Sequence, residues 1–236
     1  MDKIETNNPK IIVALDFADE SPALELIERL DPKRCRLKVG KEMFTRYGPN
    51  FVEKLTKKGY DIFLDLKFHD IPNTVAGGCR SAAELGVWMV NVHALGGRKM
   101  MEAAREALDK SAVRPLLIGV TILTSMGQED IEQVGLSGSP ADNVRRLALL
   151  AEDAGLDGVV CSPKEVAMLR QTISHEFKLI TPGIRPAWAE KGDQTRITTP
   201  ADAVALGSDY LVIGRPVTAA ADPLEALCRI EKELAG

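Results

Sequence analysis

The chain has 236 residues, 45% of them hydrophobic and 27% charged, which is the composition of a globular protein with a sizeable core. A net charge of -4 gives no sign of the basic surface that nucleic-acid binding requires, no apolar run is long enough to cross a bilayer, and the polar start of the chain lacks the apolar stretch of a signal peptide. Because the four cysteines lie far apart and form no C-x-x-C pair, the sequence argues against disulfides and zinc sites. Together, these features predict a cytoplasmic protein that binds neither nucleic acid nor membrane.

Eight short apolar runs alternate with segments of helical periodicity along the whole chain. The predicted strands cover, in chain order, residues 11–16, 35–40, 61–67, 88–93, 116–123, 158–162, 178–183 and 210–214. Segments between them, such as 74–86 and 141–155, carry apolar residues at helical spacing. Three of these segments end in a glycine placed as a helix C-terminal cap, namely Gly59, Gly86 and Gly155. Residues 185–200 predict a long loop, and a loop of that length in a compact domain is usually functional.

Strand–helix alternation of this kind predicts a parallel sheet. Eight units in a chain of about 250 residues match a closed (β/α)8 barrel. The alternative is an open doubly wound sheet, which usually has a glycine-rich turn after its first strand, whereas ALDFADES stands at residues 14–21 here. No linker-like or low-complexity segment divides the chain. We therefore predict an α/β fold, a single (β/α)8 TIM barrel domain over residues 1–236.

Polar side chains gather where the predicted strands end, and catalytic groups of such barrels sit at that end. In chain order they are Asp16, Lys38, Asp65, Lys67, His93, Thr124, Ser125, Arg185 and Arg215. Each of them alone is consistent with a solvated rim residue, and His93 with a side chain that orients its neighbours by hydrogen bonding. Together they bring charges of both signs to one end of a barrel whose strand interiors are apolar, which favours a functional site.

The segment DLKFHDIPNTV, residues 65–75, places two carboxylates and an amine just after a buried strand. Asp65 and Lys67 are two residues apart and therefore point to the same face of the strand. Asp16 and Lys38 come from neighbouring strands and extend the pair into an alternating row of carboxylates and ammonium groups. Such a row keeps a lysine protonated while its carboxylates press against an anionic substrate. The residues alone leave open whether Asp70 faces this site or reaches a neighbouring subunit.

A second cluster follows the last two predicted strands. Gly214 and Arg215 precede a predicted short helix, where backbone N–H groups suit a phosphate and the arginine adds a bidentate charge. The segment TPGIRP, residues 181–186, places another glycine and arginine at the preceding strand end. The loops after strands seven and eight are the usual phosphate site of these barrels. Since both loops carry the pattern, it favours a phosphate site over a simple turn.

These residues resemble the orotidine 5′-phosphate decarboxylase family. The motif is D-x-K-x-x-D at residues 65–70, followed by IPNTV at 71–75, and the likeness covers nearly the whole chain. It extends to the motifs around Asp16, Lys38, His93, Thr124, Arg185, Gln194 and Arg215. The motif D-x-K-x-x-D alone also occurs in related sugar-phosphate decarboxylases and aldol-type enzymes, whereas together with IPNTV, Lys38 and the terminal GRP at residues 214–216 it is highly specific for this family.

The resemblance implies removal of CO2 from orotidine 5′-monophosphate to give UMP, the last step of de novo pyrimidine nucleotide synthesis, with neither metal nor organic cofactor. It implies that Lys67 protonates C6 of the pyrimidine and that Asp65 lies beside the departing carboxylate. Lys38 and Asp16 would hold the ribose hydroxyls. Asp70 and Thr74 would come from the second subunit of a homodimer, whose active sites are shared across the interface.

By the same resemblance, Ser125 contacts the pyrimidine, and Gln194 with Arg215 binds the phosphate. The predicted catalytic residues are Lys67, Asp65, Asp70 and Lys38. The predicted substrate-binding residues are Asp16, Lys38, Thr74, Thr124, Ser125, Pro182, Arg185, Gln194, Gly214 and Arg215. No metal ligand is predicted.

Two alternatives fit part of the pattern. A metal-dependent sugar-phosphate decarboxylase or aldol-type enzyme on the same barrel would need an acidic ligand near the end of the second strand, where this chain has Lys38. A non-catalytic sensor of phosphate ligands could use the same scaffold. The full row of acids and amines argues against the sensor, because binding alone does not require it.

Overall fold

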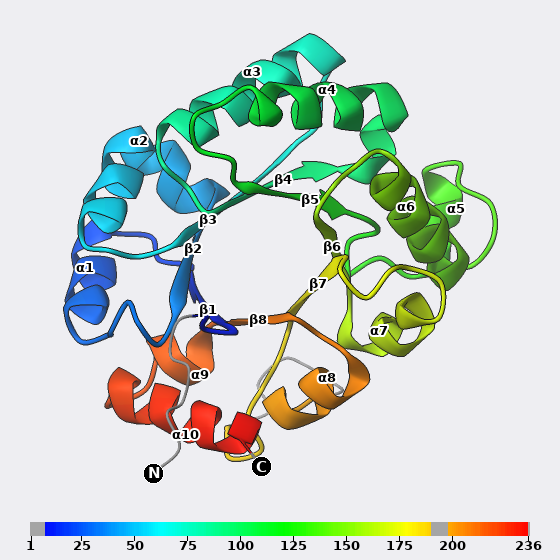
Figure 1. Ribbon diagram of the computed structural model, residues 1–236. Coiled ribbons are helices and arrows are strands. Elements are labelled where there is room, and N and C mark those ends of the chain that lie inside the picture. The colour runs from blue at the N-terminus through cyan, green and yellow to red at the C-terminus, as the bar shows by residue number, and fades with distance from the viewer. Residues whose placement is uncertain (1–7, 190–197, 236) are drawn as a thin grey trace.

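A computed structural model describes residues 8–189 and 198–235. Eight parallel strands close into a barrel in chain order, and β8 pairs with β1 to complete it (Figure 1). The strands are β1 Ile11–Leu15, β2 Arg36–Gly40, β3 Ile62–Phe68, β4 Met89–His93, β5 Leu116–Val120, β6 Gly158–Val160, β7 Lys178–Pro182 and β8 Tyr210–Ile213. Their bounds follow the predicted runs closely, and the predicted (β/α)8 barrel is confirmed.

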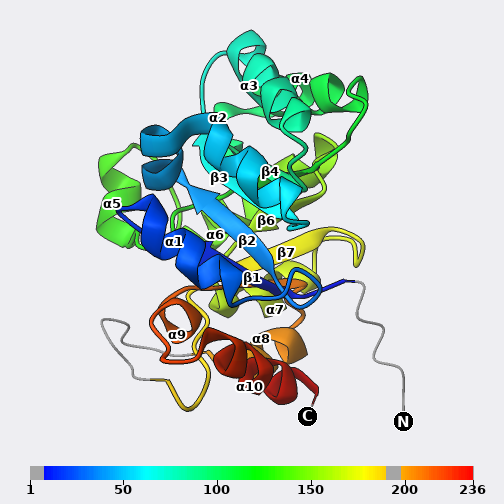
Figure 2. The same cartoon turned by 90° about the vertical axis from the view of Figure 1, so that its left-hand side faces the viewer.

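Helices surround the barrel on the outside, and Figures 1 and 2 show them on all sides of the strands. They are α1 Glu20–Glu28, α2 Lys41–Lys57, α3 Pro72–Glu84, α4 Arg98–Asp109, α5 Gln128–Gln133, α6 Pro140–Asp153, α7 Pro163–Arg170, α8 Pro200–Leu206, α9 Arg215–Thr218 and α10 Pro223–Ala235, with a 3-10 turn η1 at Ala94–Gly96. Gly59, Gly86 and Gly155 all have positive φ after a helix, as predicted. None of the described helices combines the length and the apolar character that crossing a bilayer requires.

The segment predicted as one long loop, residues 185–200, leads directly into a helix that the periodicity did not indicate. Helix α8 starts at Pro200, and the hydroxyl of Thr199 accepts a hydrogen bond from the backbone N–H of Asp202. A threonine cap followed by proline is a recognised helix start. Because α8 is short, it repeats no apolar pattern, and the cap was the one signal available.

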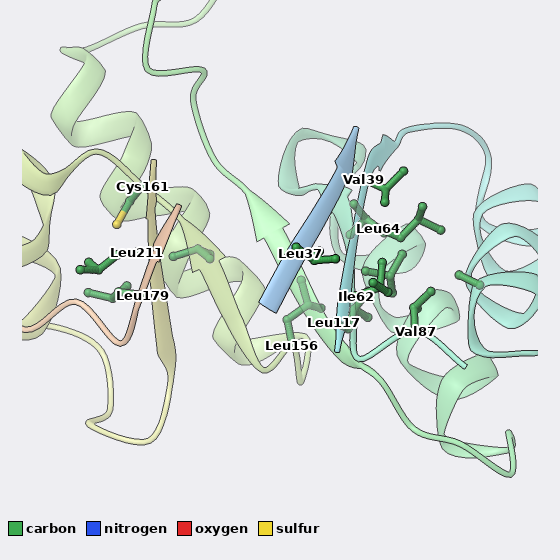
Figure 3. Packing of buried hydrophobic residues seen from close by; sticks show 14 of the residues in the cluster. Leu37, Val39, Ile62, Leu64, Val87, Leu117, Leu156, Cys161, Leu179 and Leu211 are labelled. Carbon is green, nitrogen blue, oxygen red and sulfur yellow. The ribbon is translucent and has the colours of Figure 1, made fainter. Parts of the chain in front are cut away.

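Side chains of the strands alternate between two apolar cores. Leu37, Leu64 and Leu117 point outward into the main core beneath the helices (Figure 3). Phe63, Met89 and other inward-pointing side chains fill the barrel itself. Because successive inward positions are two residues apart, the next ones toward the carboxyl ends of β3 and β4 are polar. The apolar filling therefore forms the floor beneath the polar end of the barrel.

Arg36 closes the amino-terminal end of the barrel. Its guanidinium carbon lies 4.0 Å from the ring centroid of Trp88 and 5.3 Å from that of Tyr210, and the two rings meet edge to face. Arg36 Nε donates to Asp61 Oδ2 at 3.1 Å, and a terminal nitrogen donates to Asn8 Oδ1 at 3.0 Å. Arg36 is only 4% exposed. Its charge is thus compensated by an ion pair, hydrogen bonds and two aromatic faces.

Candidate active site

The predicted charged row is assembled at the carboxyl ends of β1, β2 and β3. Lys38 Nζ donates to Asp16 Oδ1 at 2.9 Å and lies 3.6 Å from Asp65 Oδ2. Lys67 Nζ donates to Asp65 Oδ1 at 2.5 Å. The order Asp16, Lys38, Asp65, Lys67 therefore alternates carboxylate and ammonium, and each charge has a neighbour of opposite sign.

The members of the row differ in their access to solvent. The side chains of Lys38 and Asp65 are 10% and 13% exposed, that of Lys67 is 26% exposed, and that of Asp16 is 67% exposed. Burial alone would raise the pKa of Asp65. The ammonium groups of Lys38 and Lys67, with hydrogen bonds from Lys67 and Asn91, outweigh burial and hold this pKa below its usual range. Asp65 is therefore an ionised carboxylate between two cations.

Asn91, on β4, contacts the row from inside the barrel and was not among the predicted site residues. Its Nδ2 donates to Asp65 Oδ1 at 2.7 Å, and its Oδ1 accepts the backbone N–H of Lys67 at 2.8 Å. Asn91 has no exposed surface. The available signal was one amide within the otherwise apolar run 88–92, at a position two residues from the inward-pointing Met89.

The backbone of β3 is irregular where it carries the row. Lys67 has φ +54°, and within residues 8–189 and 198–235 it is the only non-glycine residue with positive φ. Leu64 pairs with Val90, but the next pair is Phe68 with Val92. Sparsely populated backbone conformations of this kind cost of order 1–3 kcal/mol and cluster at functional sites.

His93 ends β4 beside the row. Its ring centroid lies 5.4 Å from that of His69, which is exposed. Burial, together with the positive charges of His69, Lys41 and Lys67, lowers the pKa of His93 to about 4. His93 is therefore neutral near pH 7 and adds no cation to the row. Its predicted orienting role stays a prediction.

In the part of the chain that the structure describes, neither Asp70 nor Thr74 has a hydrogen bond or ion pair to the row of its own chain. Both are exposed, and Asp70 Oδ1 accepts the backbone N–H of Ile71 at 2.6 Å, just before α3. Ile71, between them in the chain, is 66% exposed.

The predicted phosphate residues stand at the same end of the barrel, after β7 and β8. Pro182 ends β7, Arg185 is buried, and the backbone N–H of Arg185 donates to the carbonyl of Thr198 at 3.1 Å. Gly214 precedes α9, and Arg215, its first residue, is exposed. The short helix expected here is therefore present. Gln194 lies outside the described residues.

Thr124 and Ser125 lie in the segment after β5 and are exposed. Since they follow the carboxyl end of a barrel strand, they too stand at the end that carries the row. Within the part of the chain that the structure describes, no three His, Cys, Asp or Glu side chains are grouped so as to hold a metal ion.

A sequence model of the orotidine 5′-phosphate decarboxylase / HUMPS family matches residues 9–230. The chain belongs to this family. Orotidine 5′-phosphate decarboxylase of Nitrosospira multiformis is 60% identical over 97% of this chain and 95% of its own length. The enzyme of the same name from Vibrio cholerae is 59% identical over 97% of this chain and 99% of its own length.

The fold agrees with this family as well. The crystal structure of orotidine 5′-phosphate decarboxylase from Lactobacillus acidophilus superimposes with a TM-score of 0.87 at 40% sequence identity, covering 98% of this chain and all of that one. The resemblance drawn from the motifs is therefore confirmed, as is the expectation of a decarboxylase on a TIM barrel. Both the family match and the structural similarity to a decarboxylase argue against a non-catalytic sensor.

Proposed function

We propose that this chain decarboxylates orotidine 5′-monophosphate to UMP without a metal ion, and that Lys67 delivers the proton that replaces CO2 at C6. The observation that carries the proposal is the row Asp16–Lys38–Asp65–Lys67 at the carboxyl end of a barrel of this family. The homologues named for this reaction support the choice of substrate.

The reaction needs an electrostatic partner more than a nucleophile. When the bond from C6 to the carboxylate breaks, its electron pair stays on C6 in an sp² orbital that cannot delocalise into the ring. With no electron sink, the barrier has to fall by about 20 kcal/mol, towards the top of the enzymatic range. The Lys67 ammonium stabilises the negative charge that develops at C6 and then transfers a proton there. Lys67 is left neutral and regains its proton from solvent.

Asp65 contributes in two ways. Its carboxylate forms an ion pair with Lys67 and so holds the amine of that lysine in place. It would also lie beside the substrate carboxylate, and repulsion between the two anions is relieved as neutral CO2 leaves. The lowered pKa of Asp65 is consistent with this second role, because a protonated acid would not repel the substrate.

Binding of the remaining substrate would use the outer residues of the site. Lys38 and the exposed Asp16 suit the ribose hydroxyls, and Thr124 with Ser125 would contact the pyrimidine. The phosphate would be held by the loops after β7 and β8, through Pro182, Arg185, Gln194, Gly214 and Arg215. Contacts so far from C6 can still lower the barrier when they drive closure of the site.

We further infer a homodimer in which Asp70 and Thr74 enter the site of the partner. Both side chains are exposed and lie outside their own row, and the exposed Ile71 offers an apolar contact next to them. A metal-dependent reaction is the second candidate, but the end of β2 presents the Lys38 ammonium where an acidic ligand would be needed.

The decisive experiment follows the ultraviolet absorbance of orotidine 5′-monophosphate in the presence of the purified protein, with and without a chelator. We expect the absorbance to fall as UMP forms, at the same rate in both samples. Turnover that stops with the chelator would favour the metal-dependent alternative. A stable absorbance in all samples would refute the proposed reaction.

A further inference from the structure

We propose that Asn91 is a positioning residue that fixes the irregular segment of β3 and so sets Lys67 against Asp65. The inference deepens the proposed function and rests on it. Asn91 contacts both members of the pair, yet it lies below them and is fully buried. It would therefore act through Lys67 and Asp65.

The pairing of β3 with β4 shows why such a residue is needed. Between the pairs Leu64–Val90 and Phe68–Val92, three residues of β3 face a single residue of β4, Asn91. A bulge of this kind leaves backbone groups without their regular partners. Here the backbone N–H of Lys67 donates to the side-chain oxygen of Asn91 at 2.8 Å. The side chain thus takes the place of a missing backbone acceptor.

Only one orientation of the Asn91 amide satisfies both contacts. The Asp65 carboxylate can only accept a hydrogen bond, and the backbone N–H of Lys67 can only donate one. The amide therefore turns Nδ2 toward Asp65 and Oδ1 toward Lys67. A buried alanine or leucine at this position would deprive the backbone N–H of Lys67 of this acceptor and would remove one of the hydrogen bonds to Asp65, which keeps its contacts with Lys67 and Lys38.

The same contact stabilises an unfavourable backbone. Lys67 has φ +54°, a conformation that a residue with a side chain seldom adopts. Loss of the acceptor would let Lys67 relax toward an extended conformation and move its ammonium group. A misplacement of about 1 Å at a reacting group can cost about 10²-fold in rate. The bulge, the buried amide and the left-handed lysine are thus three parts of one arrangement.

The test compares Asn91→Ala with wild type and with a matched control. Asn143, in α6, is also buried, and its Nδ2 donates to the carbonyls of Ser137 and Ser139, both at 2.9 Å, away from the row. We expect Asn91→Ala to lower kcat about 10²-fold, with a much smaller change in the Kd for UMP. We expect Asn143→Ala to lower the melting temperature and leave kcat close to wild type.

A second variant, Asn91→Asp, keeps the volume and the acceptor and adds a pH readout. Ionised, the new side chain accepts from Lys67 but cannot donate to Asp65, whereas its protonated form can do both. The charged groups around it are Asp65 and Lys67 on β3, Lys38 on β2, and the titratable His93 on its own strand. Its β5 neighbour is the apolar Ile118. We expect the kcat of this variant relative to wild type to rise as pH falls, while the ratio for Asn91→Ala stays flat.

The outcomes separate this inference from the proposed function. If wild type does not turn over orotidine 5′-monophosphate, the proposed function fails. The crystal structure of Asn91→Ala then still tests the role of Asn91, and a Lys67 φ that remains near +54° overturns that role. If wild type is active, an Asn91→Ala kcat within about twofold of wild type overturns it. Should Asn91→Ala not fold, a wild-type kcat for Asn91→Asp across the pH range overturns it.

Discussion

Lys67 Nζ lies 2.5 Å from Asp65 Oδ1, although a single residue separates the two on β3. On a regular strand, residues two apart have Cα atoms about 6.6 Å apart and side chains that run parallel. Here the contact forms within a bulge, with φ +54° at Lys67, so the pair does not lie on a regular strand. The amine of Lys67 is thereby placed at the end of the barrel where the proposed proton transfer takes place.

Replacing Lys67 by alanine should remove the proposed proton donor and the cation that faces the developing charge. We expect the kcat of Lys67→Ala to fall by more than about 10³-fold, the scale of losing both effects, with an unchanged fold by circular dichroism. Lys54→Ala is the control, because Lys54 lies on α2 in an exposed pair with Glu20. A near-normal kcat in Lys67→Ala would refute the assignment.

Mixing two inactive variants tests whether Asp70 acts in the partner's site. Lys67→Ala and Asp70→Ala chains should recover activity when mixed, because a mixed dimer holds one site with both residues intact. A mixture of Lys67→Ala with Asp65→Ala should not recover, since both residues belong to the same row and every mixed site lacks one of them. Absence of recovery in the first mixture, despite demonstrated subunit exchange, would place Asp70 in the site of its own chain.

Arg215→Ala should weaken binding of the phosphate with a smaller effect on chemistry. A hydrogen bond to a charged group contributes about 1.5–3 kcal/mol, so we expect KM to rise at least about tenfold, and kcat to fall less. The matched control is a substrate without the phosphate, orotidine, whose slow turnover should be nearly insensitive to the substitution. Equal losses with both substrates would show that Arg215 does something other than bind phosphate.

The lowered pKa of Asp65 predicts how stability depends on pH. Its folded-state pKa lies below the unfolded-state value of about 3.9, so between these two values the unfolded chain binds more protons and stability rises with pH. The contribution is complete above about pH 3.9 and is lost as pH falls through the folded-state pKa.

Urea unfolding of wild type and Asp65→Asn from about pH 3 to about pH 6 checks this dependence. The difference between the free energies of unfolding of wild type and Asp65→Asn should shift in favour of wild type as the pH rises, with most of the shift at the acidic end. A difference that is independent of pH would show that Asp65 is not stabilised in its ionised form.

Removal of Arg36 should destabilise the barrel without altering the reaction. Arg36→Ala leaves a cavity between Trp88 and Tyr210, and we expect a loss of about 2–4 kcal/mol in the free energy of unfolding, as for other large-to-small core changes. Arg36→Met keeps most of the volume and should lose less, since the carboxylate of Asp61 is half exposed and stays solvated without its partner. Equal losses in the two variants would show that charge, not packing, dominates.

The eight strands could be predicted because each is a short apolar run between polar segments, and a parallel barrel repeats that pattern. The row could be predicted because its charged residues end three such runs. The bulge at Lys67 could not, since no glycine or proline marks it and positive φ at a lysine is exceptional. Asn91 was missed for a related reason: its importance depends on the pairing of β4 with an irregular β3, which no local pattern reveals.

The closed amino-terminal end of the barrel has a consequence for how molecules enter and leave the site. Because Arg36, Trp88 and Tyr210 fill that end, and apolar side chains fill the interior above it, the described part of the barrel leaves the partly exposed Lys67 open to solvent at the carboxyl end. In the proposed reaction, a nucleotide bound there would cover the same opening by which CO2 leaves. In the proposed reaction, the water that returns a proton to Lys67 would arrive by the same route, so that reprotonation of Lys67 and release of product would share one opening.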